Sequence, residues 1–104
     1  MSTSSNFLKM KNVFTLTIEG RNYSSGKNVK SIYIVEGDNG ERFMIGNSQP
    51  LSDVPITVET YGTQYSGDFA QTAIITKTTC KVVLSEKRYD DSVDAKTTLQ
   101  EYSF

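Results

Sequence analysis

The sequence predicts an all-β fold, most simply a small five-stranded barrel of the OB type with a protruding hairpin. Two observations favour it. Short runs of β-branched and aromatic residues are separated by turn-forming residues at spacings of roughly 8 to 12 positions. Apolar residues nowhere keep a helical spacing for more than two turns. An immunoglobulin-like sandwich uses about seven strands, which is more than these runs supply.

Length and composition indicate one soluble domain. The chain has 104 residues, of which 37% are hydrophobic and 22% charged, with a formal net charge of −1. Its apolar runs fall far short of the roughly 20 residues that span a bilayer, and its first ten residues lack the apolar region of a signal peptide. Cys80 is the only cysteine, so an internal disulfide is excluded and a reducing compartment, the cytoplasm, is expected.

Charge divides the chain into a basic body and an acidic end. Residues 1 to 89 contain ten Lys or Arg against eight Asp or Glu, whereas residues 90 to 104 contain one lysine against four acids. We therefore expect a flexible N-terminus over residues 1–9, a β-barrel domain over 10–89 and an acidic C-terminal tail over 90–104.

The first strand and the first hairpin are the clearest elements. Residues 13–19 alternate with period two, which places Phe14, Leu16 and Ile18 on one face. Residues 21–30 are expected to form a polar loop with Ser24, Ser25 and Gly26 at its tip. Strands over 31–36 and 41–47 then pair through a type I′ turn at Asn39-Gly40, because a turn at Asp38-Asn39 would oppose Glu36 to Glu41. This register sets Glu36 opposite Phe43 and Ile34 opposite Ile45. It puts Ile32, Ile34, Phe43 and Ile45 on the better core face.

The second half of the chain predicts shorter strands. A strand over 54–61 contains Pro55, which cannot donate to a β-ladder and therefore marks a strand start or an edge. Residues 61–67 are expected to form an exposed loop. The run over 69–84 should bulge or break near Thr78-Thr79, and the one candidate helix covers residues 94–100.

The sequence contains few residues that could support catalysis, and we predict that the protein is not an enzyme. The chain has no histidine, the commonest general base and metal ligand. Cys80 sits within a β-run, where a buried structural thiol is expected. The carboxylate pairs Asp38 with Glu41 and Asp90 with Asp91 are explained by a turn and a solvated tail. No metal-ligand spacing and no phosphate-binding loop occurs, so no metal and no cofactor are expected.

Basic and aromatic residues favour single-stranded nucleic acid as a ligand. Cations follow a phosphate backbone, and aromatic rings stack on unpaired bases. Each such residue alone is explained as well by surface packing or solubility, but together they indicate a binding surface. The candidates are Arg21, Tyr23, Lys27, Lys30, Tyr33, Arg42, Tyr61 and Tyr65.

The order of the strand VFTLTIE, the basic loop RNYSSGKNVK and the strand SIYIVEG resembles the gene-five type of single-stranded DNA-binding protein from filamentous bacteriophages. The resemblance implies an OB-like homodimer that coats single-stranded DNA during replication. It also implies that Arg21, Tyr23, Lys27 and Tyr33 are binding positions. The last residues, DDSVDAKTTLQEYSF, are similar to the tails of bacterial and phage single-strand binding proteins. This likeness implies that Phe104 docks a replication protein.

Two other functions stay open. A small phage-encoded inhibitor, or another module that binds a host protein, would use the same tyrosines, because tyrosine is favoured at protein interfaces. A virion component would assemble with copies of itself. If the protein binds DNA, we expect it to be encoded by a phage or a plasmid and to act in the cytoplasm of the host cell. We also expect it to dimerise in a way that covers the edge strand over 54–61.

Overall fold

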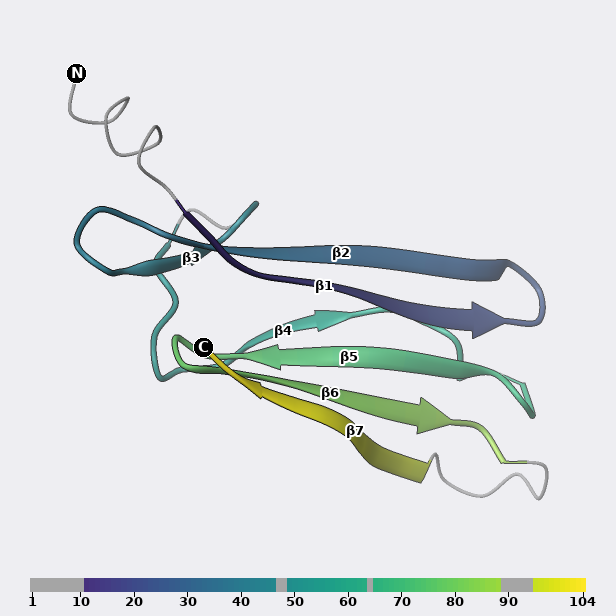
Figure 1. The fold of residues 1–104 in the computed structure, drawn as a ribbon. Coiled ribbons are helices and arrows are strands. Elements are labelled where there is room, and N and C mark those ends of the chain that lie inside the picture. Colours follow the sequence, from purple (N-terminus) through teal and green to yellow (C-terminus); the bar gives the residue numbers. More distant parts are fainter. Residues whose placement is uncertain (1–10, 47–48, 64, 89–94) are drawn as a thin grey trace.

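The computed structural model describes residues 11–46, 49–63, 65–88 and 95–104, and within these ranges the chain is all-β (Figure 1). It contains seven strands: β1 (Lys11–Asn22), β2 (Gly26–Glu36), β3 (Arg42–Met44), β4 (Ile56–Glu59), β5 (Phe69–Ile75), β6 (Thr79–Glu86) and β7 (Ala95–Ser103). No helix in this part of the chain is long and apolar enough to cross a membrane.

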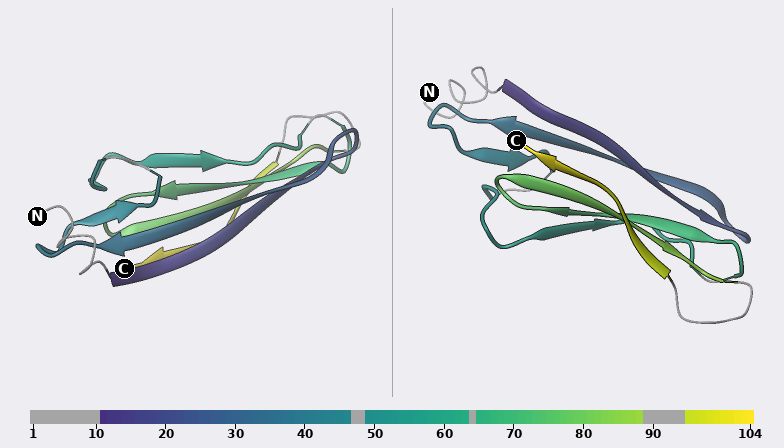
Figure 2. Two further views of the ribbon diagram at one scale, coloured as in Figure 1. Left: turned by 90° about the horizontal axis from the view of Figure 1, so that it is seen from above. Right: turned by 60° about the horizontal axis from the view of Figure 1, so that its bottom comes forward.

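All strand pairs are antiparallel, in the order β3-β2-β1-β5-β6-β7, and β4 pairs with β5 as a side branch. Strands β1 and β5 are joined only where Gly20 faces Ala70 and Arg21 faces Phe69. Away from this junction the β1–β2–β3 group and the β4–β7 group separate into two layers. Figure 2 shows the β1–β2 ribbon running beside the other group along its length.

The core lies between the two layers. Alternation in β1 and β2 turns Ile18, Ile32 and Ile34 inward, as the period of two requires. The opposite layer contributes Ala73, Ile75, Cys80 and Val82, and Leu51 closes the cluster. Phe14 and Leu16 pack against the same cluster, so the predicted inner face of the first strand is confirmed.

The all-β class is confirmed, but seven strands replace the expected five, and the described sheet is open. Strands β3 and β7 lie at its two ends and do not pair with each other, so an OB-like barrel is not confirmed. Two of the additional strands have clear origins. The run over 69–84 divides into β5 and β6 at a turn in which Thr76 N–H donates to the Thr79 carbonyl at 2.9 Å, so the expected break is confirmed. The C-terminal residues supply the other.

The predicted polar loop over 21–30 is wrong. Strand β1 continues to Asn22 and β2 begins at Gly26 in an unbroken register that runs from Phe14 opposite Ile34 to Asn22 opposite Gly26. Backbone pairing needs no apolar side chains, so polar residues extend the ribbon. Only residues 23–25 turn the chain, helped by Gly26 with φ of 81°.

The predicted register of the β2–β3 hairpin is also wrong, by one residue. Glu36 faces Arg42, and Ile34 faces Met44. Gly40 N–H donates to the Gly37 carbonyl at 3.1 Å, and Gly37 N–H donates to the Glu41 carbonyl at 2.7 Å. The loop is therefore Asp38-Asn39-Gly40, a turn followed by a left-handed residue, Gly40, with φ of 81°.

This register also changes which side chains reach the core. Met44 packs against the core cluster, in place of the expected Phe43 and Ile45. Ile45 is exposed.

Strand β7 replaces the expected helix over 94–100 and brings residues 95–104, expected in the tail, into the sheet. It pairs with β6 along its whole length, with a bulge opposite Val82 and Val83. Thr97 and Thr98 are β-branched and suit a strand. The N-terminus over 1–9 and the acids Asp90, Asp91 and Asp94 lie outside the described residues.

Strand β4 is shorter than the predicted strand over 54–61, and Val54 is exposed ahead of it. Pro55 directly precedes the strand, which pairs only with β5. Its predicted position at a strand start on an edge is confirmed.

Two glycines allow a third segment to press against the β1–β5 junction. A Cβ atom at Gly20 would meet the Tyr61 carbonyl oxygen, and one at Gly62 would meet the carbonyl oxygens of Arg21 and Phe69. Residues 60–62 therefore lie directly on the backbone of the two strands. Any larger residue at these positions has to push the segment away.

We expect Gly20→Ala to lower the free energy of unfolding by about 3 kcal/mol, because its new methyl group meets backbone that cannot rotate away. Gly46→Ala is the matched control. Gly46 has φ of 92° but open space around it, so only the left-handed conformation costs free energy, about 1 kcal/mol. Urea unfolding followed by circular dichroism measures both. A smaller loss for Gly20→Ala than for Gly46→Ala would contradict the close approach.

Candidate nucleic-acid interface

The candidate interface lies at one end of the molecule, where three connections meet (Figure 1). We call this end the tip and define it by residues 21–27, 65–69 and 87–88. Backbone hydrogen bonds join its parts: Gly67 N–H donates to the Lys87 carbonyl at 3.0 Å, and Lys87 N–H donates to the Asp68 carbonyl at 3.0 Å. The loop over 61–67, predicted to be exposed with aromatic contents, presents Tyr61 and Tyr65 at the surface.

Asp68 organises the tip. The residue is only 4% exposed, and its carboxylate accepts hydrogen bonds from Tyr23 N–H through Oδ1 and Tyr65 N–H through Oδ2, both at 3.0 Å. Hydrogen bonds to a charged acceptor are stronger than those between neutral groups. A single carboxylate thus ties the β1–β2 turn to the loop that precedes β5.

The two tyrosines held by Asp68 form a ring pair. The ring centroids of Tyr23 and Tyr65 are 5.9 Å apart with planes inclined at 65°, an edge-to-face arrangement that aromatic rings favour. Tyr23 is 86% exposed and Tyr65 is 47% exposed. With Ser24 and Ser66 they line a shallow hollow. Exposed ring faces are therefore presented on a fixed backbone.

Two cations lie beside this pair. Arg21 and Lys27 face each other directly across β1 and β2, and like charges in this position are destabilising. Glu19 lies 3.8 Å from the Lys27 ammonium nitrogen, whereas Arg21 forms no ion pair among the described residues. On its other side Arg21 faces Phe69, which in turn faces Glu86. An anionic ligand would relieve the repulsion between the two cations.

Of the eight predicted residues, the structure brings four together: Arg21, Tyr23, Lys27 and Tyr65. Tyr33 shares the outward face of the ribbon, but it lies opposite Thr15, about 20 Å along β1 from Arg21 at the usual rise of a strand. Lys30 lies opposite Ile18, on the other face of the ribbon. Those two residues therefore do not belong to the tip surface.

Tyr61 is also separate from the ring pair. Its backbone N–H donates to Asn28 Oδ1 at 3.1 Å, and Asn28 Nδ2 donates to its carbonyl at 2.7 Å. Asn28 and Lys30 lie on the same face of β2, because alternate residues of a strand share a face. Tyr61 is thus held to the face opposite Arg21 and Lys27.

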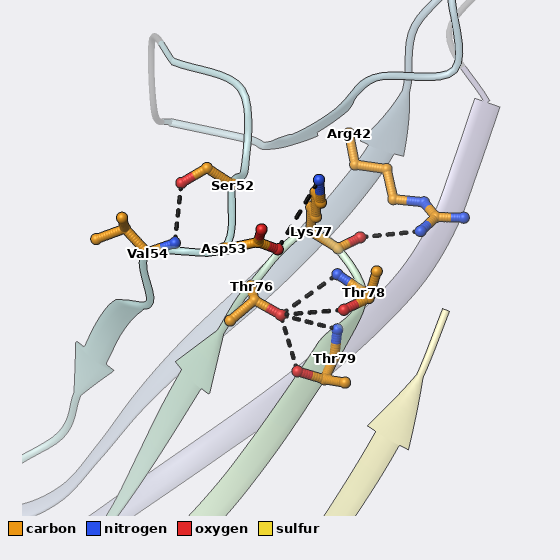
Figure 3. A network of polar contacts seen from close by, with 8 residues as sticks. All are labelled: Arg42, Ser52, Asp53, Val54, Thr76, Lys77, Thr78 and Thr79. Carbon is orange, nitrogen blue, oxygen red and sulfur yellow. Dashed lines mark hydrogen bonds and ion pairs between the residues drawn. The ribbon is translucent and has the colours of Figure 1, made fainter.

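Arg42 lies at the far end of the molecule in a structural network (Figure 3). Its Nη1 donates to the Lys77 carbonyl at 2.9 Å, and its guanidinium carbon lies 5.7 Å from the Phe104 ring centroid. Lys77 pairs with Asp53 at 3.8 Å. Arg42 Nε is buried and has no hydrogen-bond partner among the described residues. The side chain joins β3 to the β5–β6 turn and the last residue, remote from the tip.

Phe104, predicted to dock a partner, is half-buried in the same region. Its ring centroid is 5.0 Å from that of Phe14, and its N–H donates to the Thr78 carbonyl at 2.8 Å. A partner that captured this ring would first have to withdraw it from Phe14 and Arg42.

Sequence reasoning missed Asp68, Glu19 and Phe69. The signal for Asp68 was weak: it follows Ser66-Gly67 and precedes a β-run, which is the usual place of a turn aspartate. Nothing in the sequence pairs it with Tyr23, 45 positions away.

The described residues offer little to hold a metal or to act as a nucleophile. No three His, Cys, Asp or Glu residues gather within the described ranges. Cys80 is fully buried, and desolvation raises the pKa of its thiol above the ordinary value of 9.0. A buried thiol that holds its proton is a poor nucleophile.

No family model, curated protein or solved structure matches this chain.

We expect Asp68→Ala to lower the free energy of unfolding by about 3 kcal/mol, because two backbone N–H groups lose a charged acceptor. Asp68→Asn should cost about half as much, since the amide oxygen still accepts. The exposed turn residue Asp38 is the control, and Asp38→Ala should change stability by less than about 0.5 kcal/mol. Equal effects of Asp68→Ala and Asp38→Ala in urea unfolding would contradict the role of Asp68.

Cys80 should react with a thiol reagent at pH 8 only when the protein unfolds. Burial raises the pKa of the folded thiol above 9.0, so between the unfolded and folded pKa values the native state binds more protons. The contribution of the Cys80 thiol to the free energy of unfolding is therefore complete below pH 9. It is lost as the pH rises through the pKa of the folded state. Comparing the wild type with Cys80→Ala from pH 8 to 10 isolates this contribution. Parallel stability curves would contradict the shift.

Proposed function

We propose that this protein binds single-stranded DNA through the tip, without strong sequence preference. The observation that supports this most directly is the cross-strand pair of Arg21 and Lys27 near the ring pair of Tyr23 and Tyr65, whose backbones are held by Asp68. Two cations that face each other across the ribbon, of which only Lys27 has an acidic partner among the described residues, suit a phosphate. Two exposed rings suit unpaired bases.

The chemistry explains the expected lack of sequence preference. Phosphate contacts position a strand without reading it, and every base offers a π-face to an aromatic ring. Among the described residues, the hollow at the ring pair is lined by Tyr23, Ser24, Tyr65 and Ser66, none of which has an amide side chain for reading base edges. One tip offers two cations and two rings, so we expect a single copy to bind weakly.

The proposal is narrower than the sequence alone suggested. Arg42, Lys30 and Tyr61 are left out by their positions, and Tyr33 would be reached only by a strand that continues along the β1–β2 ribbon. A closed OB-like barrel is not required, because both components of the tip are placed by the ribbon and by Asp68. The resemblance to the gene-five type of single-stranded DNA-binding protein supports a role in phage or plasmid replication, which is part of this proposal.

Binding by two copies would extend the footprint. Strand β4, within the segment first expected to dimerise, has only four residues and follows Pro55, which limits further pairing. Strand β7 is longer, with nine residues, and its second edge pairs with no other strand of the described chain. We therefore place the proposed homodimer contact on β7. Recruitment of a replication protein through Phe104 has less support, because that ring is packed.

A protein-binding module is the second candidate, and the ring pair itself favours it. Tyrosines that are exposed and held in place are typical of the residues that dominate protein interfaces. The salt dependence of binding distinguishes the two functions, because the affinity of an interface centred on tyrosines depends far less on salt than that of contacts to phosphates.

Titration with a twelve-residue oligothymidine, followed by tyrosine fluorescence and anisotropy, tests the proposal. Two phosphate contacts predict a log–log salt slope of about −1.4. Lys27→Gln should reduce this slope by about 0.7, and Tyr23→Ala should weaken binding by about tenfold through lost stacking. The matched controls are Lys30→Gln, on the opposite ribbon face, and Tyr61→Ala, in the same loop as Tyr65.

Binding that responds equally to Lys27→Gln and Lys30→Gln would show that the tip is not the site. If oligothymidine changes neither signal at micromolar protein in low salt, the DNA-binding proposal fails and the protein-binding candidate takes its place.

A further inference from the structure

A second surface lies on the opposite face of the sheet from Arg21 and Lys27. Gly20 and Asn22 alternate with Arg21 along β1, so they point to the other side. There residues 60–63 form the wall of an open hollow of about 530 Å³. Its polar lining includes Glu59, Tyr61, Thr63, Thr72, Ser85 and Lys96.

Four strands build this hollow by ordinary β pairing. Glu59 of β4 faces Thr72 of β5, and Ser85 of β6 faces both Ala70 of β5 and Lys96 of β7. Directly paired residues share a face of the sheet, so these side chains converge without any special loop. Ala70 provides a small floor between them.

The wall of the hollow is held in place by hydrogen bonds. Thr60 Oγ1 donates to the Gln71 carbonyl at 2.7 Å and accepts from Gln71 N–H at 3.0 Å. The Tyr61 backbone is bonded on both sides to Asn28. The hollow is therefore bounded by fixed backbone on one side and by the sheet on the other.

Five of the polar side chains that line the hollow are unpaired within the described residues. The hydroxyls of Thr63, Thr72 and Ser85, the Glu59 carboxylate and the Lys96 ammonium group have no hydrogen-bond or ion-pair partner within the described parts of the chain. Hydroxyls both donate and accept, carboxylates accept and ammonium groups donate. The hollow thus presents a full set of unused donors and acceptors.

We propose that this hollow binds a short neutral saccharide. A ligand rich in hydroxyls matches groups that both donate and accept. The charges of Glu59 and Lys96 cancel and lie on strands at opposite ends of the hollow, β4 and β7, so a net charge on the ligand gains nothing. The exposed Tyr61 ring at the rim offers an apolar face to the C–H groups of a sugar and a hydroxyl to its oxygens.

A phosphate ligand fits this surface poorly. Only Lys96 would attract it, and Glu59 would repel it. The saccharide site is therefore independent of the DNA-binding proposal, and the two use different residues on opposite faces of the sheet.

Amide chemical shifts of the full chain, recorded by NMR, test the inference. The probes are maltose, cellobiose, lactose and chitobiose at about 20 mM, enough to detect a Kd of about 1 mM. At least one should shift the amides of residues 60–63, 72 and 85 in a saturable way. Thr72→Val, which keeps the side-chain shape, should weaken that binding about fivefold. Thr98→Val, on β7 outside the hollow, should leave it unchanged.

Three results would overturn the inference: no saturable shift with any of the four sugars, equal affinity of the wild type and Thr72→Val, or saturable shifts with diglycine in place of the sugars. The last would assign the hollow to a zwitterion that spans Glu59 and Lys96. Circular dichroism of Thr72→Val confirms its fold. Oligothymidine should shift residues 21–27 and 65–69 and not residues 60–63, 72 and 85, so failure of either proposal is recognised separately.

Discussion

The short pairing between the end of β1 and the start of β5 is the constraint on which the rest of the structure depends. Gly20 opposite Ala70 and Arg21 opposite Phe69 are the only β-ladder pairs that join a strand of one layer to a strand of the other in the described chain. The link is accessible to residues 60–62 only because Gly20 and Gly62 have no side chains. The same few residues therefore join the layers, begin the tip and form the wall of the hollow.

Because side chains alternate along β1 at this junction, two different sets of polar groups lie on opposite faces of the sheet. One residue, Arg21, points to the face with Lys27, and its neighbours Gly20 and Asn22 belong to the other face. One side thus gathers opposed cations and exposed rings, and the other gathers unpaired hydroxyls between charges of opposite sign. A shift of one residue in the β1–β2 register would exchange the faces. The long ladder from Phe14 to Asn22 prevents such a shift.

The sequence was sufficient for the features that depend on local alternation. Phe14, Leu16 and Ile18 were placed on the correct face, and the break near Thr78 and the edge position of Pro55 were found. The predictions that were wrong concerned backbone pairing, which cannot be read from the types of the side chains. Polar residues 21–30 extended a ribbon, and residues 95–103 joined β6 in place of a helix. Gly40 accommodated a three-residue loop that charge repulsion alone did not suggest. Four of the eight site residues meet because Asp68, 45 positions from Tyr23, ties two loops together, and no local pattern encodes that distance.

The Asp68 carboxylate also determines what association has to accomplish. Because the backbones of Tyr23 and Tyr65 are fixed before a partner arrives, binding does not have to order two loops. Ordering each mobile side chain at an interface costs roughly 0.5 to 1.5 kcal/mol. Such preorganisation appears mainly as slower dissociation of the complex. In the proposed complex, the lifetime of the bound partner would therefore depend on Asp68, a buried group that does not itself form the binding surface.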